Sequence, residues 1–199
     1  ELPEDTARVL AEMSDAIMVR THEHRTVERI AAHSRVPVIN GLTNRFHPCQ
    51  LLADLMTFRE HRGDIAGRTV AWIGDGNNMC NSYINASGLM GFDLKVASPE
   101  GYEPSERGVP TDAGRVELMH DAERAVRDAD LVATDVWASM GQEAETSERL
   151  KAFSGYTVDP ALLSQANAGA LFMHDMPAHY GEEVPPGMLE HRQSVAFPQ

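Results

Sequence analysis

Short apolar runs alternate along this chain with stretches in which apolar residues recur at helical spacing. The apolar runs predict buried strands at residues 16–19, 36–39, 69–73, 94–97, 116–119, 131–134 and 170–173. The periodic stretches predict helices at residues 6–13, 23–33, 48–62, 79–90, 121–130, 147–153 and 160–166. Because strands that alternate with helices form parallel sheets, the pattern predicts an α/β fold.

The alternation restarts after Gly63, at the end of the longest predicted helix. We therefore expect two lobes of parallel sheet flanked by helices, residues 1–62 and residues 63–199, joined by that long helix. The second lobe should be a doubly wound, Rossmann-like domain, in which ligands bind beyond the carboxyl ends of the strands. A cleft between the lobes is the expected site. Polar residues follow the predicted strand ends in both lobes: Arg20, residues 40–50, residues 75–78, residues 98–100, His120, Asp135 and His174.

The helix at residues 48–62 begins with a group suited to binding an anion. Pro48 stands in the first turn, where a missing N–H is tolerated. His47 and Gln50 lie beside the free N–H groups at the positive end of the helix dipole, and His47 adds a titratable donor. The same helix should bury one face, formed by Leu51, Leu52, Leu55 and Phe58.

The charge of the chain argues against two classes of partner. Among 199 residues, 30 are acidic and 17 are Lys or Arg, which gives a formal charge of −13. Nucleic acids and anionic membrane surfaces need clustered Lys and Arg, so neither is expected as a partner. No apolar run approaches the ~18 residues of a membrane span. The two cysteines, Cys49 and Cys80, do not form a disulfide framework and favour a reducing, cytoplasmic location.

The segment Gly74-x-Gly76-x-x-Met79 matches a dinucleotide-binding turn only in part. Met79 replaces the third glycine, and no acidic residue ends the next strand to bind a ribose. A tight turn between strand and helix is the simpler interpretation. The paired amides of Asn77 and Asn78 at the helix start could bind a carboxylate or an ammonium group.

Metal-dependent and covalent chemistry both lack a supporting pattern. His174 and His179 are five residues apart, which does not place two ligands on one helical face, so no metal is expected. Cys49 has no orienting partner nearby, so it is not expected to act as a nucleophile. Asp135 precedes a tryptophan and a Ser-Met-Gly loop; it could be a simple turn residue or the partner of an ammonium group.

Four stretches carry a resemblance to a known family, in the order in which the family has them. Residues 47–50, His-Pro-Cys-Gln followed by Leu-Leu-Ala-Asp, resemble the His-Pro-x-Gln signature of the aspartate/ornithine carbamoyltransferase family. The preceding Val-Ile-Asn-Gly-Leu is similar to the ornithine branch, and residues 74–79, 134–141 and 174–179 resemble further family motifs. The resemblance implies transfer of a carbamoyl group from carbamoyl phosphate to the δ-amino group of L-ornithine, giving L-citrulline and phosphate. It also implies that no cofactor is used and that the assembly is a homotrimer or a multiple of trimers.

The resemblance further implies roles for single residues. Arg20 and His47 would be catalytic, stabilising charge on the carbonyl and phosphate, and would bind carbamoyl phosphate together with Gln50. Asp175 stands where the family has a cysteine beside the attacking amine. A carboxylate there would either hold the amine as unreactive ammonium or take its proton as a general base. The residues that would bind ornithine are Asn78, Asp135, Ser139 and Met140.

Two kinds of departure from the family pattern, missing segments and changed residues, keep other functions open. The family's Ser-Thr-Arg-Thr phosphate loop is not found in the sequence, and neither is the Arg-bearing segment expected soon after Gln199, so we expect a chain without its N-terminal part and its last helix. Asp175 replaces a cysteine, and Tyr180 replaces an arginine that follows it in the family. The alternatives are a carbamoyltransferase for another amine or amino acid, and a non-catalytic homologue that binds amino acids.

Overall fold

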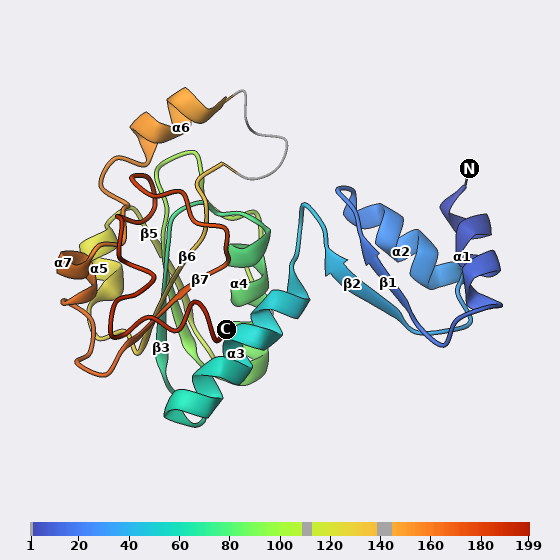
Figure 1. The fold of residues 1–199 in the computed structure, drawn as a ribbon, viewed down its shortest axis with the longest axis horizontal. Coiled ribbons are helices and arrows are strands. Elements are labelled where there is room, and N and C mark those ends of the chain that lie inside the picture. The colour runs from blue at the N-terminus through green and yellow to red at the C-terminus, as the bar shows by residue number, and fades with distance from the viewer. Residues whose placement is uncertain (1, 109–112, 139–144) are drawn as a thin grey trace.

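The computed structural model describes residues 2–108, 113–138 and 145–199, which form two lobes (Figure 1). The first lobe contains α1 (Pro3–Ala11), β1 (Ile17–Arg20), α2 (His24–His33) and β2 (Val38–Leu42). The helix α3 (Pro48–Arg62) connects it to the second lobe. The second lobe contains β3 (Thr69–Ile73), α4 (Asn78–Met90), β4 (Asp93–Ala97), β5 (Val116–Met119), α5 (Ala122–Val126), β6 (Leu131–Thr134), α6 (Thr146–Ala152), α7 (Pro160–Leu163) and β7 (Leu171–His174).

The second lobe is built on a five-stranded parallel sheet with the order β5-β4-β3-β6-β7. The chain therefore winds outward from β3 in both directions, as predicted for a Rossmann-like domain, and the direction reverses between β3 and β6. Successive side chains of β3 enter opposite cores: Trp72 packs with α3 and α4, whereas Ile73 packs with α5 and α7. Figure 1 shows these helix pairs on opposite faces of the sheet. The predicted α/β fold with parallel sheets and an interdomain helix is confirmed.

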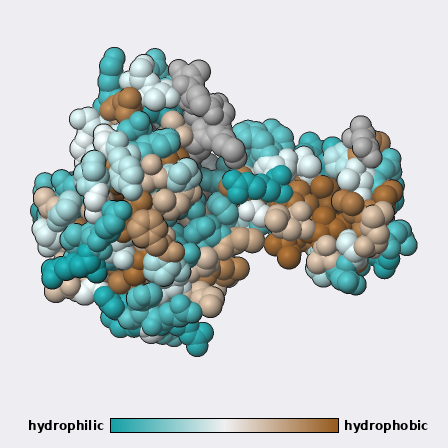
Figure 2. Space-filling model, in the orientation of Figure 1, coloured by the Kyte–Doolittle hydropathy of each residue, from teal (hydrophilic) through white to brown (hydrophobic). Residues whose placement is uncertain are grey.

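The first lobe has a two-stranded parallel sheet, in which β1 pairs with β2. The prediction that both strands are buried is wrong, because α1 and α2 leave one face of this sheet uncovered: Met18 is 65% exposed and Ile39 is 46% exposed. Figure 2 shows hydrophobic side chains gathered on the surface of this lobe.

The helix α3 begins at Pro48 and ends at Arg62, as predicted, and Gly63 follows it with a φ of 82°. The predicted buried face is wrong at one position. Leu52 is 56% exposed, and Asp54 lies in the buried stripe with Leu51 and Phe58. Helices α5 and α7 are shorter than predicted and end at Val126 and Leu163 instead of residues 130 and 166. Helix α5 ends early because Asp128, with a φ of 63°, cannot continue a right-handed helix.

One face of α4 joins the two lobes through three hydrogen bonds, which we call the interlobe latch. The Nδ2 atoms of Asn78 and Asn81 donate to the carbonyl oxygens of Thr43 and Arg45, at 2.8 and 3.2 Å. The backbone N–H of His47 donates to Ser82 Oγ at 2.8 Å. The latch fixes the segment before α3 against the first turns of α4. No helix in the described ranges is long and apolar enough to cross a membrane.

Candidate functional site

The predicted site residues collect where the strand ends of the second lobe face the start of α3. Arg20 is the exposed last residue of β1, and His47 is the N-cap of α3. Asp175 directly follows β7. The positive charge of Arg20 lowers the pKa of His47 and also opposes the rise in the pKa of Asp175. Groups of the first lobe, the connecting helix and the second lobe therefore share one electrostatic environment.

His47 is held as a neutral imidazole. Burial lowers the pKa of its ring below the usual 6.5, and the nearby charge of Arg20 lowers it further. Its Nδ1 atom is buried and has no hydrogen-bond partner in the described part of the chain. A neutral ring can donate a hydrogen bond to a carbonyl oxygen without carrying a charge of its own. His47 is therefore suited to polarise a bound carbonyl group.

Gln50 is positioned one helical turn before a buried carboxyl group. Its Nε2 atom donates to Asp54 Oδ1 at 2.9 Å, and the hydroxyl of Tyr83, on α4, donates to Asp54 Oδ2 at 2.6 Å. Burial raises the pKa of Asp54 to about 7, although the hydrogen bonds from Tyr83, Gln50 and Gln199 lower it. Neither Asp54 nor Tyr83 was predicted as a site residue from the sequence. The signal for Asp54 was a carboxyl group four residues after Gln50 within an apolar stripe.

The turn after β3 places Asn77 and Asn78 at the point where the sheet changes direction. Asn77 caps α4, because its Oδ1 accepts from the N–H groups of Met79 and Cys80, and its Nδ2 donates to Asp135 Oδ2 at 2.7 Å. Asn78 is engaged in the interlobe latch. Asp135 lies just beyond β6 and is 7% exposed, so the strand ends bring the predicted ammonium partner against the amide pair.

Asp135 and Asp175 form a group of carboxyls with Asp54. Burial raises the pKa of Asp135 to about 6, against hydrogen bonds from the Val136 N–H and from Asn77. Burial raises the pKa of Asp175 to about 9, and the charges of Asp135 and Asp54 raise it further. A site with this many mutually repelling carboxyls favours a cationic ligand or bound protons.

The remaining predictions at this edge have mixed outcomes. Ser139 and Met140 lie outside the described residues. His174 is buried, and its Nε2 lies 3.0 Å from Glu183 Oε1, so it serves a buried pair. Among the described residues, His179, Glu182 and Glu183 could together hold a cation. The contact with His174 and a hydrogen bond from the His179 N–H already account for the position of Glu183 without an ion.

The glycine turn after β3 is explained by packing. A Cβ atom at Gly76 would meet the backbone nitrogen of Pro104 at 2.1 Å, so the loop that contains Pro104 fills the space beside this turn. Gly74 has a φ of 133°, which residues with side chains rarely adopt. Both glycines therefore have a local structural reason that needs no dinucleotide.

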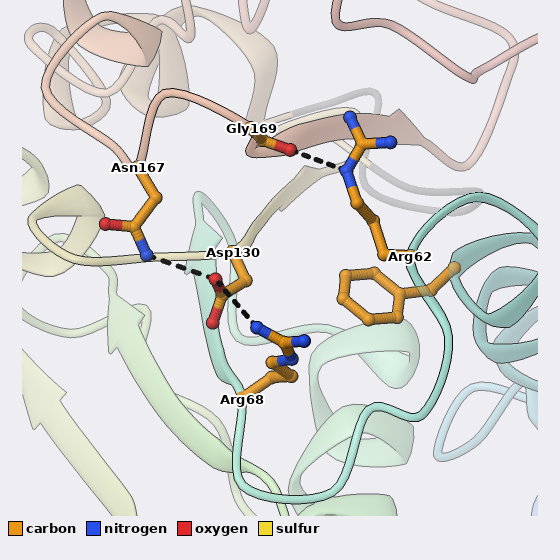
Figure 3. A pocket seen from close by; sticks show the side chains of 6 residues that line it. Arg62, Arg68, Asp130, Asn167 and Gly169 are labelled. Carbon is orange, nitrogen blue, oxygen red and sulfur yellow. Dashed lines mark hydrogen bonds and ion pairs between the residues drawn. The ribbon is translucent and has the colours of Figure 1, made fainter.

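A hollow of about 230 Å³ lies at the other edge of the five-stranded sheet, at the amino ends of its strands (Figure 3). Figure 3 shows that its polar groups already have partners. Arg62 Nε donates to the backbone oxygen of Gly169 at 2.8 Å, and Asn167 Nδ2 donates to Asp130 Oδ1 at 3.1 Å. Arg68 lies 3.8 Å from the same carboxylate. Ligands of this fold bind at the opposite edge, so we assign no ligand to this hollow.

Comparison with known proteins agrees with this geometry. Residues 66–199 match the model of the aspartate/ornithine carbamoyltransferase Asp/Orn binding domain, and residues 1–60 match that of the carbamoyl-P binding domain of the same family. The chain belongs to the aspartate/ornithine carbamoyltransferase family. In this family context, the edge described above lies between segments that match the two binding domains.

Similar members of the family are named ornithine carbamoyltransferases. The protein of Methylococcus capsulatus is 62% identical over 194 residues, which are 98% of this chain and 65% of that protein. The anabolic enzyme of Pseudomonas aeruginosa is 55% identical over 195 residues, with 98% and 64% covered. The structure of the Pyrococcus furiosus enzyme superimposes with a TM-score of 0.91 at 46% identity, covering 99% of this chain and 65% of that one. The chain thus spans slightly less than two thirds of the length of these relatives.

Proposed function

We propose that the protein to which this chain belongs transfers the carbamoyl group of carbamoyl phosphate to the δ-amino group of L-ornithine, forming L-citrulline and phosphate. The observation that carries the proposal is the charge arrangement across the lobes. Arg20 at the end of β1 and a neutral His47 at the start of α3 lie opposite the carboxyl groups of Asp135 and Asp175. This arrangement suits an anionic donor on one side and a cationic acceptor on the other.

The donor end would be held by Arg20, His47 and Gln50. Attack of the amine on the carbonyl carbon places negative charge on the carbonyl oxygen before the bond to the phosphate oxygen breaks. His47 would donate a hydrogen bond to that oxygen, and Arg20 would bind the phosphate as it leaves. Gln50 would bind the carbamoyl NH2 group through its amide oxygen. Support comes from the low pKa of His47, which keeps its ring neutral, and from its unpartnered Nδ1.

The acceptor end would be held by Asn78, Asp135 and the segment with Ser139 and Met140. Asp135 is a buried carboxyl whose second role, as a partner of Asn77, keeps it directed at this edge. An ammonium group would lower its raised pKa and ionise it, so binding of a cation is favoured. Asn78 would bind the amino-acid end after leaving Thr43, which links acceptor binding to a change in the interlobe latch.

Asp175 would accept the proton that the δ-amine must lose. A free alkyl ammonium titrates near ~10.4, so a base with a raised pKa is better matched to it than an ordinary carboxylate. A proton passes readily between groups of similar pKa, and the pKa of Asp175 is about 9. Asp175 must be ionised to accept the proton, and the positive charge of a bound ammonium group favours that ionised form. The Asp175 carboxyl accepts no hydrogen bond within the part of the chain that the structure describes, which leaves it available to the acceptor.

The assembly and location are also proposals. We propose a homotrimer, or a multiple of trimers, with subunit contacts through the first lobe, whose sheet exposes Met18 and Ile39. A cytoplasmic location is supported by the two free cysteines, Cys49 and Cys80. The division of the chain at residues 62 and 63 is supported by the glycine that ends α3.

The test is a citrulline assay with the protein encoded by the complete reading frame. Purified protein is given carbamoyl phosphate with L-ornithine, L-lysine or a diamine that lacks the carboxylate. Formation of citrulline with a clear preference for ornithine is expected. Because Asp175 and Tyr180 differ from the family pattern, preference for another amine is the second candidate. Absence of product with every amine, together with measurable ornithine binding, would indicate a non-catalytic homologue.

A further inference from the structure

Asp54 is buried at the boundary between the connecting helix and the second lobe. Asp54 belongs to α3 and is 2% exposed. Its carboxylate accepts one hydrogen bond from α3 itself and one from α4. Gln50 Nε2 approaches Oδ1 at 2.9 Å from the preceding turn, and Tyr83 Oη approaches Oδ2 at 2.6 Å from α4. Tyr83 is itself fully buried, so it cannot easily exchange this partner for water.

An ionised carboxylate accepts hydrogen bonds and cannot donate them. When Asp54 is ionised, the amide of Gln50 must therefore turn its NH2 group toward Asp54 and leave its carbonyl oxygen for another donor. We propose that Asp54 is a positioning residue that holds the Gln50 carbonyl oxygen toward the carbamoyl NH2 group, and that Tyr83 fixes Asp54 from the second lobe. This inference rests on the function proposed above, in which Gln50 binds that NH2 group.

The electrostatic surroundings of Asp54 make the orientation of the Gln50 amide dependent on the protonation of Asp54. The groups that face Asp54 are Tyr83 on α4, Gln50 on α3, Gln199 at the carboxyl end, and the carboxyls of Asp135 and Asp175. The charge of Arg20 lowers the pKa of Asp175, the carboxyl group that interacts with Asp54. With its pKa at about 7, Asp54 would be protonated in part at neutral pH, and a protonated oxygen could donate to the Gln50 carbonyl instead. The amide would then present the wrong end to the substrate.

The first experiment is a double-mutant cycle in the protein from the complete reading frame. Asp54→Asn can donate to Gln50 Oε1 while still accepting from Tyr83, so the amide should reverse. We expect the kcat/KM for carbamoyl phosphate to fall about 10- to 100-fold, with little change in the KM for ornithine. In a Gln50→Ala background, Asp54→Asn should have no further effect on this ratio, because Asp54 acts through Gln50.

The matched control is Asp130→Asn. Asp130 also accepts two hydrogen bonds through one carboxylate, from the Thr69 N–H and from Asn167 Nδ2, but at the opposite edge of the sheet. Asp130→Asn should lower the melting temperature without changing the KM for carbamoyl phosphate or the KM for ornithine. Tyr83→Phe, which keeps the ring in the core, should reduce kcat/KM less than Asp54→Asn. Additive effects of Asp54→Asn and Gln50→Ala, or wild-type kinetics for Asp54→Asn, would overturn the inference.

A second experiment tests the positioning role without measuring activity, so its result is independent of the proposed function. It also does not require Asp54→Asn to fold. The side-chain NH2 signals of Gln50, assigned by their loss in Gln50→Ala, are followed by NMR across pH 5–9. In the wild type they should shift with the ionisation of Asp54, and this shift should be altered in Tyr83→Phe. Signals insensitive to both pH and Tyr83→Phe would refute the positioning role. Absence of citrulline with this titration intact would refute the proposed function alone.

Discussion

At the residue scale, the buried position proposed for Asp175 in the reaction should lower the stability of the fold. Its carboxyl group is surrounded by buried carboxyls, and its pKa is raised to about 9. In the unfolded chain the same group ionises near the usual aspartate pKa of 3.8. Between these values the unfolded state binds fewer protons than the folded state, so the free energy of unfolding falls as pH rises. Asp54, Asp75 and Asp135, whose pKa values are also raised, act in the same direction.

We predict that Asp175→Asn stabilises the protein, and more at pH 8 than at pH 5. Asparagine stays neutral in both states, so the variant avoids the pH-dependent loss. Because each pH unit between the two pKa values is worth about 1.4 kcal/mol, the difference between pH 5 and pH 8 should be about 3–4 kcal/mol, seen as a larger rise in melting temperature at pH 8. The control is Asp121→Asn, since Asn also caps α5 and the group is exposed. A shift for Asp175→Asn that is equal at both pH values would contradict the prediction.

The same residue should also control the reaction rate. We predict that Asp175→Cys, which restores the family residue, lowers kcat at least about tenfold because a base that matches the amine is lost. The pH profile of kcat is the deciding measurement. A faster enzyme with its optimum moved to lower pH would mean that Asp175 traps the ammonium, and an unchanged profile would mean that the substitution is catalytically silent.

His47 should act mainly on the transition state. We predict that His47→Ala lowers kcat about 10²–10³-fold while the ornithine dissociation constant changes less than about twofold, because the charge it stabilises develops only during attack. The neighbouring Cys49 is exposed, so Cys49→Ala is the matched control and should leave both values unchanged. If turnover survives in His47→Ala, the residue has no part in the mechanism.

At the scale of elements, Asn77 at the start of α4 both caps the helix and donates a hydrogen bond to Asp135, the proposed partner of an ammonium group. Asn77→Ser keeps an oxygen to cap the helix but removes the donor to Asp135. Loss of that hydrogen bond raises the pKa of Asp135 further and weakens its hold on an ammonium group. We predict a several-fold rise in the ornithine KM with a small loss of stability for Asn77→Ser. Asn77→Ala should lose about 1 kcal/mol more.

The control for this pair is Asp121→Ala, which removes the cap of α5 at a distance from the proposed site. It should lower the melting temperature and leave the ornithine KM unchanged. Equal ornithine KM values for wild type and Asn77→Ser would show that the contact with Asp135 has no part in acceptor binding.

The elements that could be predicted from sequence are those with an unambiguous apolar run or a strong boundary signal. Thr69–Ile73 and Leu131–Thr134 match the prediction because their apolar runs are buried on both faces, and Pro48 and Gly63 fix the two ends of α3. The end of α5 could not be predicted, because the positive φ of Asp128 is set by tertiary packing. The exposure of Met18 likewise depends on which elements cover the sheet.

The positions of Arg20 and Asp135 at the candidate site could be predicted because polar residues follow strand ends there, whereas Asp175 was expected only from the family resemblance. The contacts that support the candidate site could not be predicted from the sequence. Tyr83 and Asp54 are 29 residues apart in sequence, and nothing in either local pattern indicates that they meet. Asn78 also has a contact that sequence reasoning missed, since its amide reaches back to Thr43 in the preceding segment. Such contacts depend on how α3 and α4 are placed against each other.

At the scale of the whole molecule, the two lobes should contribute differently to assembly. The hydrophobic clusters on the two faces of the five-stranded sheet lie within residues 46–199. We therefore predict that a truncated protein with these residues folds cooperatively and is monomeric. The protein from the complete reading frame should be a trimer or a multiple of trimers in light scattering. Trimers formed by the truncated protein would place the subunit contact in the second lobe.

The interlobe latch has a consequence for how this protein can change over evolutionary time. On the side of α4 it uses the side chains of Asn78, Asn81 and Ser82, but on the other side it uses only backbone atoms of residues 43–47. Substitutions at Asn44 or Arg45 leave those backbone groups in place. Such substitutions would lose the contacts of Asn44 with the His24 N–H and of Arg45 with Glu106 but keep the latch. Replacement of Asn78, Asn81 or Ser82 would instead remove one of its hydrogen bonds directly.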